Sequence, residues 1–340
     1  MAMNVGGAIT PTMNHTGRVL FRPFAMRKWL GLGLVSMLAE LGGGGGGGGG
    51  GGSNFPSSDS PSAAEMSRMM VGWIVEHVVL IVIGCVLLFA VGLALMWLGS
   101  IFRFVYLNQI TRDPYAIRKP FGRFIGLGTS YFLWTLAFGL AMLIILAVLI
   151  GAPLLAAFAR FHGDFGPAQI LAIVWAVLAA LVVIIGANVV DVFARDFVVT
   201  AMFVRGVKVI EGWRIVMPII RANAGQSALY VLMLIVIGIV TAIGSLLVMI
   251  AVGIVFLIPM GLLALIGYAI YSAGGWSPLL IGYSIVMALA LFLALGYAMT
   301  CAMQPFMVFR RTFALVVLGQ ADPSLATVPG TTMQGWTGIG

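Results

Sequence analysis

The sequence predicts an all-α fold, a polytopic transmembrane helical bundle with about six spans. Hydrophobic residues make up 61% of the 340 residues and charged residues only 8%, whereas a soluble domain carries about 25% charged residues. The charges are also clustered, so long uncharged stretches separate them. A bilayer core needs about 20 consecutive apolar residues per helix, and five stretches reach that length.

The N-terminal segment, residues 1–41, predicts an interfacial helix. Its first 18 residues are polar and expected to be mobile. Residues 19–41 start with basic and aromatic residues, but their uncharged core, Trp29–Ala39, is too short to cross a bilayer. A signal peptide is the alternative, although no A-x-A cleavage site precedes Glu40. If this segment instead crosses the membrane, its basic residues change sides.

A flexible tether is predicted at residues 42–68, where an unbroken glycine run, Gly42–Gly52, is followed by SNFPSSDSPSAAE. Such a stretch has little to bury against its ordering entropy. No Lys-Ser/Thr pair follows the glycines, which excludes a phosphate-binding loop.

The transmembrane domain is predicted at residues 69–309, followed by a C-terminal tail at 310–340. An uncharged stretch of 47 residues, 226–272, would form a helix about 70 Å long. Gly253 and Pro259 offer a break, which gives two spans there, and a single kinked span is the alternative. The predicted spans are at about 71–98, 130–158, 168–190, 226–249, 252–272 and 279–304.

Basic loops predict the orientation. Residues 99–128 and 191–225 hold ten of the 18 Lys and Arg, so both should be cytoplasmic. The net charge of +8 fits a membrane surface better than nucleic acid. Two spans at 226–272 would place Arg310 and Arg311 outside, whereas one span would place them inside.

Four segments carry a resemblance to a known family. They are LFRPFAMRKWLGLG, FRFVYLNQITRDPYAIRKPFGRF, DFVVTAMFVRGVKVIEGWRIV and QPFMVFRRTFALVVLGQ, in this order. They resemble a family of uncharacterised bacterial polytopic membrane proteins and, more distantly, the membrane region attached to some glycerophosphodiester phosphodiesterases. The resemblance implies a multi-pass protein of the bacterial cytoplasmic (inner) membrane, and it brings no catalytic residue.

Enzyme signatures are absent from the sequence. It holds no H-E-x-x-H, C-x-x-C, G-x-S-x-G or Walker lysine, and its three histidines lie in separate regions. Cys85 and Cys301 both lie in apolar runs, which predicts neither a disulfide nor a metal site. We therefore expect no enzyme activity, no catalytic or metal-binding residue and no cofactor.

Three ionisable residues are candidates for a polar site within the membrane: Glu76, His77 and Asp191. Ionisable groups within a span usually face a partner or a water path. Glu76 and His77 could relay protons, or they could simply be hydrated near the start of their helix. Asp191 is spaced i,i+4 from Arg195 and lies near Asp196, which favours an anchoring role at the end of a span. A membrane-embedded hydrolase would require Glu76, His77 and Asp191 to converge.

Residues 195–222 predict an amphipathic helix on the cytoplasmic membrane face. Its candidate contacts with anionic lipid are Arg205, Lys208, Arg214 and Arg221, each worth about 1 kcal/mol. A plain juxtamembrane loop would have a similar composition.

These features favour a non-enzymatic membrane-organising or lipid-interacting scaffold. Its expected partners are membrane lipids with anionic head groups and other membrane proteins, and not nucleic acid. The alternative is a transporter or permease for a small solute or lipid, because broken helices such as the one predicted at Gly253–Pro259 are common at transport sites.

Overall fold

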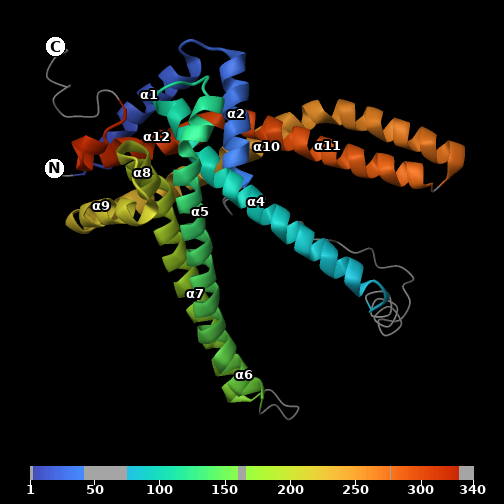
Figure 1. The fold of residues 1–340 in the computed structure, drawn as a ribbon, viewed down its shortest axis with the longest axis horizontal. Coiled ribbons are helices and arrows are strands. Elements are labelled where there is room, and N and C mark those ends of the chain that lie inside the picture. The colour runs from blue at the N-terminus through green and yellow to red at the C-terminus, as the bar shows by residue number, and fades with distance from the viewer. Residues whose placement is uncertain (1–2, 42–74, 160–165, 276, 329–340) are drawn as a thin grey trace.

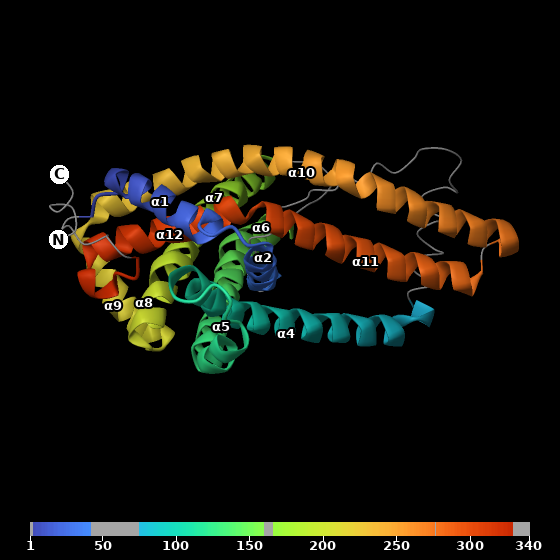
Figure 2. The same cartoon turned by 90° about the horizontal axis from the view of Figure 1, so that it is seen from above.

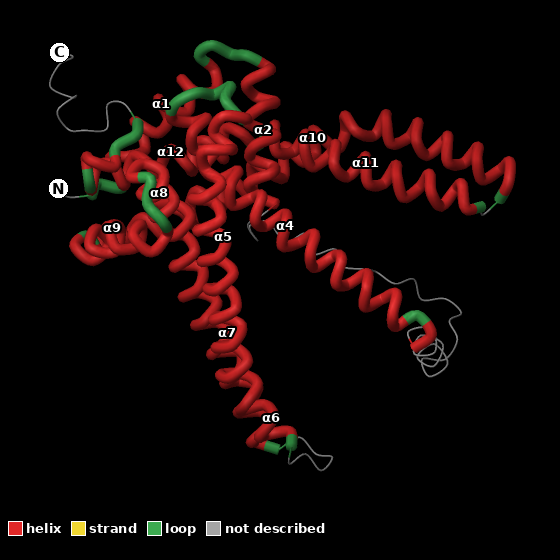
Figure 3. Tube along the Cα trace, viewed as in Figure 1, coloured by secondary structure: helices red, strands yellow, loops and turns green. Residues whose placement is uncertain are grey.

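The computed structural model describes residues 3–41, 75–159, 166–275 and 277–328 (Figure 1). All regular secondary structure in these ranges is helical (Figure 3), which confirms the predicted all-α fold class. The tether predicted at residues 42–68 lies outside the described residues. The elements are η1 (Gly6–Ala8), α1 (Ile9–Phe21), α2 (Met26–Leu41), α4 (Val78–Thr111), α5 (Arg118–Leu146), η2 (Ala147–Gly151), α6 (Ala152–Phe158), α7 (Pro167–Phe193), η3 (Ala194–Val198), α8 (Val199–Arg205), α9 (Val209–Ala222), α10 (Ala224–Gly274), α11 (Pro278–Ala302), α12 (Gln304–Ala321) and η4 (Pro323–Leu325).

Long helices radiate from a packed centre (Figures 1 and 2). We call this centre the hub and define it as residues 3–41, 99–131, 191–234 and 303–328. Three arms leave it: the first part of α4, the α5–α6 and α7 hairpin, and the α10–α11 hairpin. The buried apolar side chains gather in the hub, in two clusters. Most large apolar side chains of the arms are exposed, so the arms need an apolar environment such as lipid.

Five helical segments are long and apolar enough to cross a membrane: Val78–Thr111, Arg118–Phe158, Gln169–Arg205, Ala224–Gly274 and Leu280–Ala302. At most 6% of the most apolar 18-residue window of each is buried within the protein. The expected number of about six spans is not confirmed.

The prediction of six spans and the five observed segments differ at α10, which runs unbroken for 51 residues through Gly253 and Pro259. The predicted break there is wrong. Pro259 removes one backbone hydrogen bond from the helix. Opening the chain in an apolar environment would leave several N–H and C=O groups unpaired, which costs more.

The N-terminal segment belongs to the hub. Residues 9–18, expected to be polar and mobile, lie in α1, where Thr12 and Leu20 are fully buried. The backbone N–H of Asn4 donates to Gln320 Oε1 at 3.2 Å, which ties the start of the chain to the end of α12. α2 packs against α4 and α11 through buried Leu32 and Val35, so it is a packed hub helix and not a separate interfacial one.

The single amphipathic helix predicted at 195–222 is wrong. Gly206 has a φ of 70°, a left-handed conformation that ends α8 and that glycine adopts without steric cost. The part before it is a core element, because Phe197 and Met202 are fully buried. Only α9 is amphipathic, with Val216 buried in the hub and Arg214 exposed.

The crossing of α4 and α5 is close. A Cβ added at Gly128 would lie 2.7 Å from Ile101 Cα, so only glycine fits without moving a backbone. Trp97 Nε1 also donates to Thr129 Oγ1 at 2.9 Å across the same pair of helices. α12 continues through residue 310, where the sequence suggested the start of a tail, and its residues Thr312–Gly319 are buried at the centre of the hub.

Candidate functional site

The three predicted intramembrane polar residues do not converge. Glu76 is exposed and His77 caps the start of α4, at the tip of an arm. The hub begins at Gly99, about 33 Å further along the helix at 1.5 Å per residue. Asp191 lies in the hub, near the end of α7. The convergence that a membrane-embedded hydrolase would require is therefore not present.

Asp191 forms the ion pair that its spacing indicates. Its Oδ2 lies 2.5 Å from Arg195 NH2, and both side chains keep about a fifth or more of their surface exposed, 26% and 19%. The pair therefore joins two turns of one helix at a partly hydrated position.

Asp196 is more deeply buried than Asp191, although the sequence indicated only that the two residues lie near each other. It lies in the π-helical turn η3 and is 2% exposed. Its carboxylate accepts a hydrogen bond from Tyr230 Oη at 2.9 Å and pairs with Arg311 NH1 at 3.2 Å. Arg311 NH1 also donates to the Arg195 carbonyl at 2.9 Å. Three elements distant in sequence, η3, α10 and α12, are thus joined at one carboxylate.

Arg103 brings a third guanidinium into this part of the hub. It is 6% exposed, donates to Tyr131 Oη at 2.9 Å, and lies over the same ring, 5.2 Å from its centroid. A cavity of about 10 Å³, room for at most one water molecule, lies between Arg103, Arg195, Asp196 and Arg311. Such a small space fits a structural network and leaves no room for a substrate.

The four predicted lipid-contact residues are all exposed on the hub surface. Arg205 NH2 donates to Ser324 Oγ at 2.6 Å, so part of its donor capacity is taken within the protein. Lys208 precedes α9, and Arg214 and Arg221 lie on the outward side of that helix. The structure therefore leaves these three cations free to face a head-group region.

A larger groove lies between α7 and α10, with a volume of about 500 Å³. Its walls are apolar except for Asn188, Thr241 and Arg310. Asn188 Nδ2 donates to the Ile184 carbonyl and Thr241 Oγ1 to the Ile237 carbonyl, both at 2.7 Å. Their donors are thus satisfied within their own helices.

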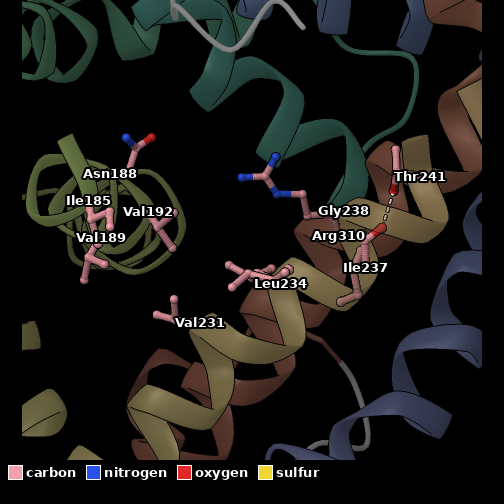
Figure 4. A pocket seen from close by; sticks show the side chains of 11 residues that line it. Ile185, Asn188, Val189, Val192, Val231, Leu234, Ile237, Gly238, Thr241 and Arg310 are labelled. Carbon is pink, nitrogen blue, oxygen red and sulfur yellow. Dashed lines mark hydrogen bonds between the residues drawn. The ribbon is translucent and has the colours of Figure 1, made fainter. Parts of the chain in front are cut away.

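Arg310 differs from these two residues because it forms no hydrogen bond or ion pair within the described residues. Figure 4 shows its side chain reaching from α12 into the space between α7 and α10, with the guanidinium on the side of Asn188. The groove crosses the boundary where the charged hub meets the apolar arms. It thus offers one unpaired cation, which comes from the hub, between walls that are mostly hydrocarbon. The sequence indicated Arg310 only as a basic residue of the tail.

The part of the chain that the structure describes contains no assembled metal-binding site. No group of three or more His, Cys, Asp and Glu side chains is placed to hold a metal ion there. Cys85 and Cys301 are free thiols.

Comparisons with known proteins bear on the family alone. Neither a curated protein nor a solved structure matches the chain. The bacterial origin and the distant likeness to glycerophosphodiester phosphodiesterases stay predictions. A family described as a family of unknown function, DUF7544, matches residues 3–328, nearly the whole chain. The predicted resemblance to an uncharacterised family is confirmed in that respect: the chain belongs to the DUF7544 family of unknown function.

Proposed function

We propose that this protein is a non-enzymatic, lipid-interacting scaffold of a bacterial cytoplasmic membrane, and that it holds an anionic phospholipid in the α7–α10 groove. The proposal rests on Arg310, a cation without a partner among the described residues, which lines a mostly apolar groove. A phospholipid has the matching form, with a phosphate at one end and hydrocarbon beyond it. The exposed cations Lys208, Arg214 and Arg221 extend the same surface for other head groups.

No group of His, Cys, Asp and Glu among the described residues is placed to hold a metal ion, in keeping with a scaffold. The sequence favoured a transporter only through the predicted helix break at Gly253–Pro259, and α10 has no break there. It remains a competing proposal, and a direct measurement separates the two.

The first experiment measures lipid binding. Native mass spectrometry of the full chain in detergent is titrated with phosphatidylglycerol. Arg310→Gln should weaken the tightest binding about fivefold, because one head-group contact contributes about 1 kcal/mol. Gly238→Leu should weaken it at least as much without a change of charge, since a Cβ at Gly238 meets nothing within 4 Å and the side chain would fill the groove.

Arg118→Gln is the control, because it removes the same charge from an exposed hub position that does not line the groove. Wild-type binding by both groove variants would refute the proposed site. The second experiment follows a fluorescent phospholipid in proteoliposomes. A scaffold leaves its exchange between leaflets unchanged, whereas faster exchange that depends on Arg310 would replace the scaffold by a lipid transporter.

A further inference from the structure

A second pocket, of about 330 Å³, lies at the edge of the hub away from the arms. The α1–α2 connection and the α4–α5 connection lie side by side there (Figure 3). The pocket is formed by residues of α1, of the α1–α2 connection, of the start of α2 and of the end of α4. It shares no residue with the α7–α10 groove, so a ligand could occupy either site without the other.

Four cations line this pocket: Arg18, Arg22, Lys28 and Arg112. None of the residues that line it is an Asp or a Glu. The acid that follows Arg112 in the sequence, Asp113, does not line the pocket, and its Oδ1 accepts the backbone N–H of Tyr115 at 3.0 Å. Cations gathered without a counter-charge repel one another, and a bound anion would remove that repulsion.

Gln109 gives an independent indication of a ligand. It is 1% exposed and lines the same pocket from α4. Neither its Oε1 nor its Nε2 has a hydrogen-bond partner among the described residues. Buried polar side chains almost always have such a partner, so the unpaired amide marks polar bonding capacity left over in the pocket wall.

Two other lining residues are held in place by backbone carbonyls. Lys28 Nζ donates to the Pro23 carbonyl at 2.9 Å, which leaves it further N–H donors. His15 Nε2 lies 3.3 Å from the Ile110 carbonyl, to which it can donate. Burial lowers the pKa of His15, and the charge of Arg18 lowers it further. These two side chains are therefore held in place before any ligand binds, which reduces the entropy that they lose on binding.

We propose that this pocket binds a phosphate group, carried either by a free phosphorylated molecule or by a lipid head group. Arg18, Arg22 and Arg112 supply charge-assisted hydrogen bonds to phosphate oxygens, for which guanidinium geometry is well suited. Lys28 adds a point charge. The pocket is a positively charged recognition site with no catalytic group.

The test measures binding to the purified full chain by isothermal titration calorimetry in detergent with inorganic phosphate. In parallel, binding to vesicles of phosphatidylcholine is compared with binding to vesicles that also contain phosphatidic acid. Saturable binding of inorganic phosphate assigns the site to a free phosphate group. Binding that requires phosphatidic acid assigns it to a lipid head group. Both outcomes support the site, whereas no binding of either probe overturns it.

Variants connect the binding to this pocket. Arg22→Gln should weaken it about tenfold or more, the effect of one charge-assisted hydrogen bond. Gln109→Glu places a carboxylate among the same cations, so phosphate binding should be lost while the melting temperature rises, which shows that the variant is folded. Arg27→Gln, an exposed position on α2 outside the pocket, should bind within about twofold of wild type, because exposed charges are largely screened by salt. Wild-type binding by both pocket variants would overturn the assignment.

Discussion

Asp196→Asn should destabilise the protein far more than Asp191→Asn, although the two aspartates lie five residues apart. Asp196 is 2% exposed, and its carboxylate joins Tyr230 and Arg311. Asparagine keeps an oxygen for the Tyr230 hydroxyl but loses the charge that balances Arg311. Removing one partner of a buried ion pair costs about 3–5 kcal/mol, and the 20% exposure of Arg311 favours the lower end, about 3 kcal/mol.

The pair formed by Asp191 should contribute much less. Its two side chains are 26% and 19% exposed, and i,i+4 pairs near a surface contribute about 0.5 kcal/mol. The free energy of unfolding lost in Tyr230→Phe should lie between the losses for Asp191→Asn and Asp196→Asn, because a hydrogen bond to a charged group is worth about 1.5–3 kcal/mol. The double variant Arg311→Gln with Asp196→Asn should lose little more unfolding free energy than either single variant, since the two side chains act as one unit.

The assay is unfolding of the purified protein in mixed micelles with increasing dodecyl sulfate, followed by tryptophan fluorescence. The free energy of unfolding of each variant is compared with that of wild type. Equal losses of unfolding free energy for Asp191→Asn and Asp196→Asn would show that burial does not determine what each carboxylate contributes to stability. A double variant whose loss equals the sum of the single losses would show that Asp196 and Arg311 are not coupled.

Three further predictions concern packing, pH and topology. Gly128→Ala should cost about 1–3 kcal/mol in the same assay, because its Cβ meets backbone across the helix crossing, whereas Gly126→Ala meets nothing within 4 Å and should be neutral or stabilising. The stability contributed by neutral His15 should be complete above its ordinary pKa of 6.5 and fall as the pH drops below it, since burial lowers its folded pKa. The melting temperature of His15→Gln should therefore depend less on pH over this range, and an unchanged dependence would contradict the argument. In intact cells of a cysteine-free background, Tyr115→Cys should be shielded from an impermeant thiol reagent and Ser272→Cys should react; the reverse pattern would invert the topology.

The sequence predicts two of the three apolar arms and little of the hub. A long uncharged run indicates an apolar environment directly, so the predicted spans 130–158 and 168–190 lie within the α5–α6 and α7 helices, although α5 begins 12 residues earlier, at Arg118. The hub combines short segments from all parts of the chain, and each appears as a charged loop when read alone. Residues 99–110 belong to the basic loop predicted at 99–128. They instead continue α4 and are buried, and Arg103 among them donates a hydrogen bond to Tyr131.

Local spacing also limits what can be said of the site. The i,i+4 rule identifies Asp191 with Arg195, and this pair forms. The partner of Asp196, Arg311, is 115 residues away, and no short pattern connects them. Gln109 gives no signal in the sequence, because an amide on a helix is unremarkable until burial leaves it without a partner. These residues emerge only when α1, α4, η3 and α12 are assembled.

The structure places the basic residues that it describes on one part of the molecule. Sixteen of the 18 Lys and Arg lie in described residues, and all sixteen lie in the hub, against six Asp and Glu there. The arms carry none of the sixteen. Because α10 is one continuous helix, Arg310 and Arg311 return to the side of the other basic residues, as a single span at 226–272 would require. The N-terminal cations also lie in the hub, because α1 and α2 pack there. By the positive-inside rule, we expect the basic hub segments that connect the spans to be cytoplasmic.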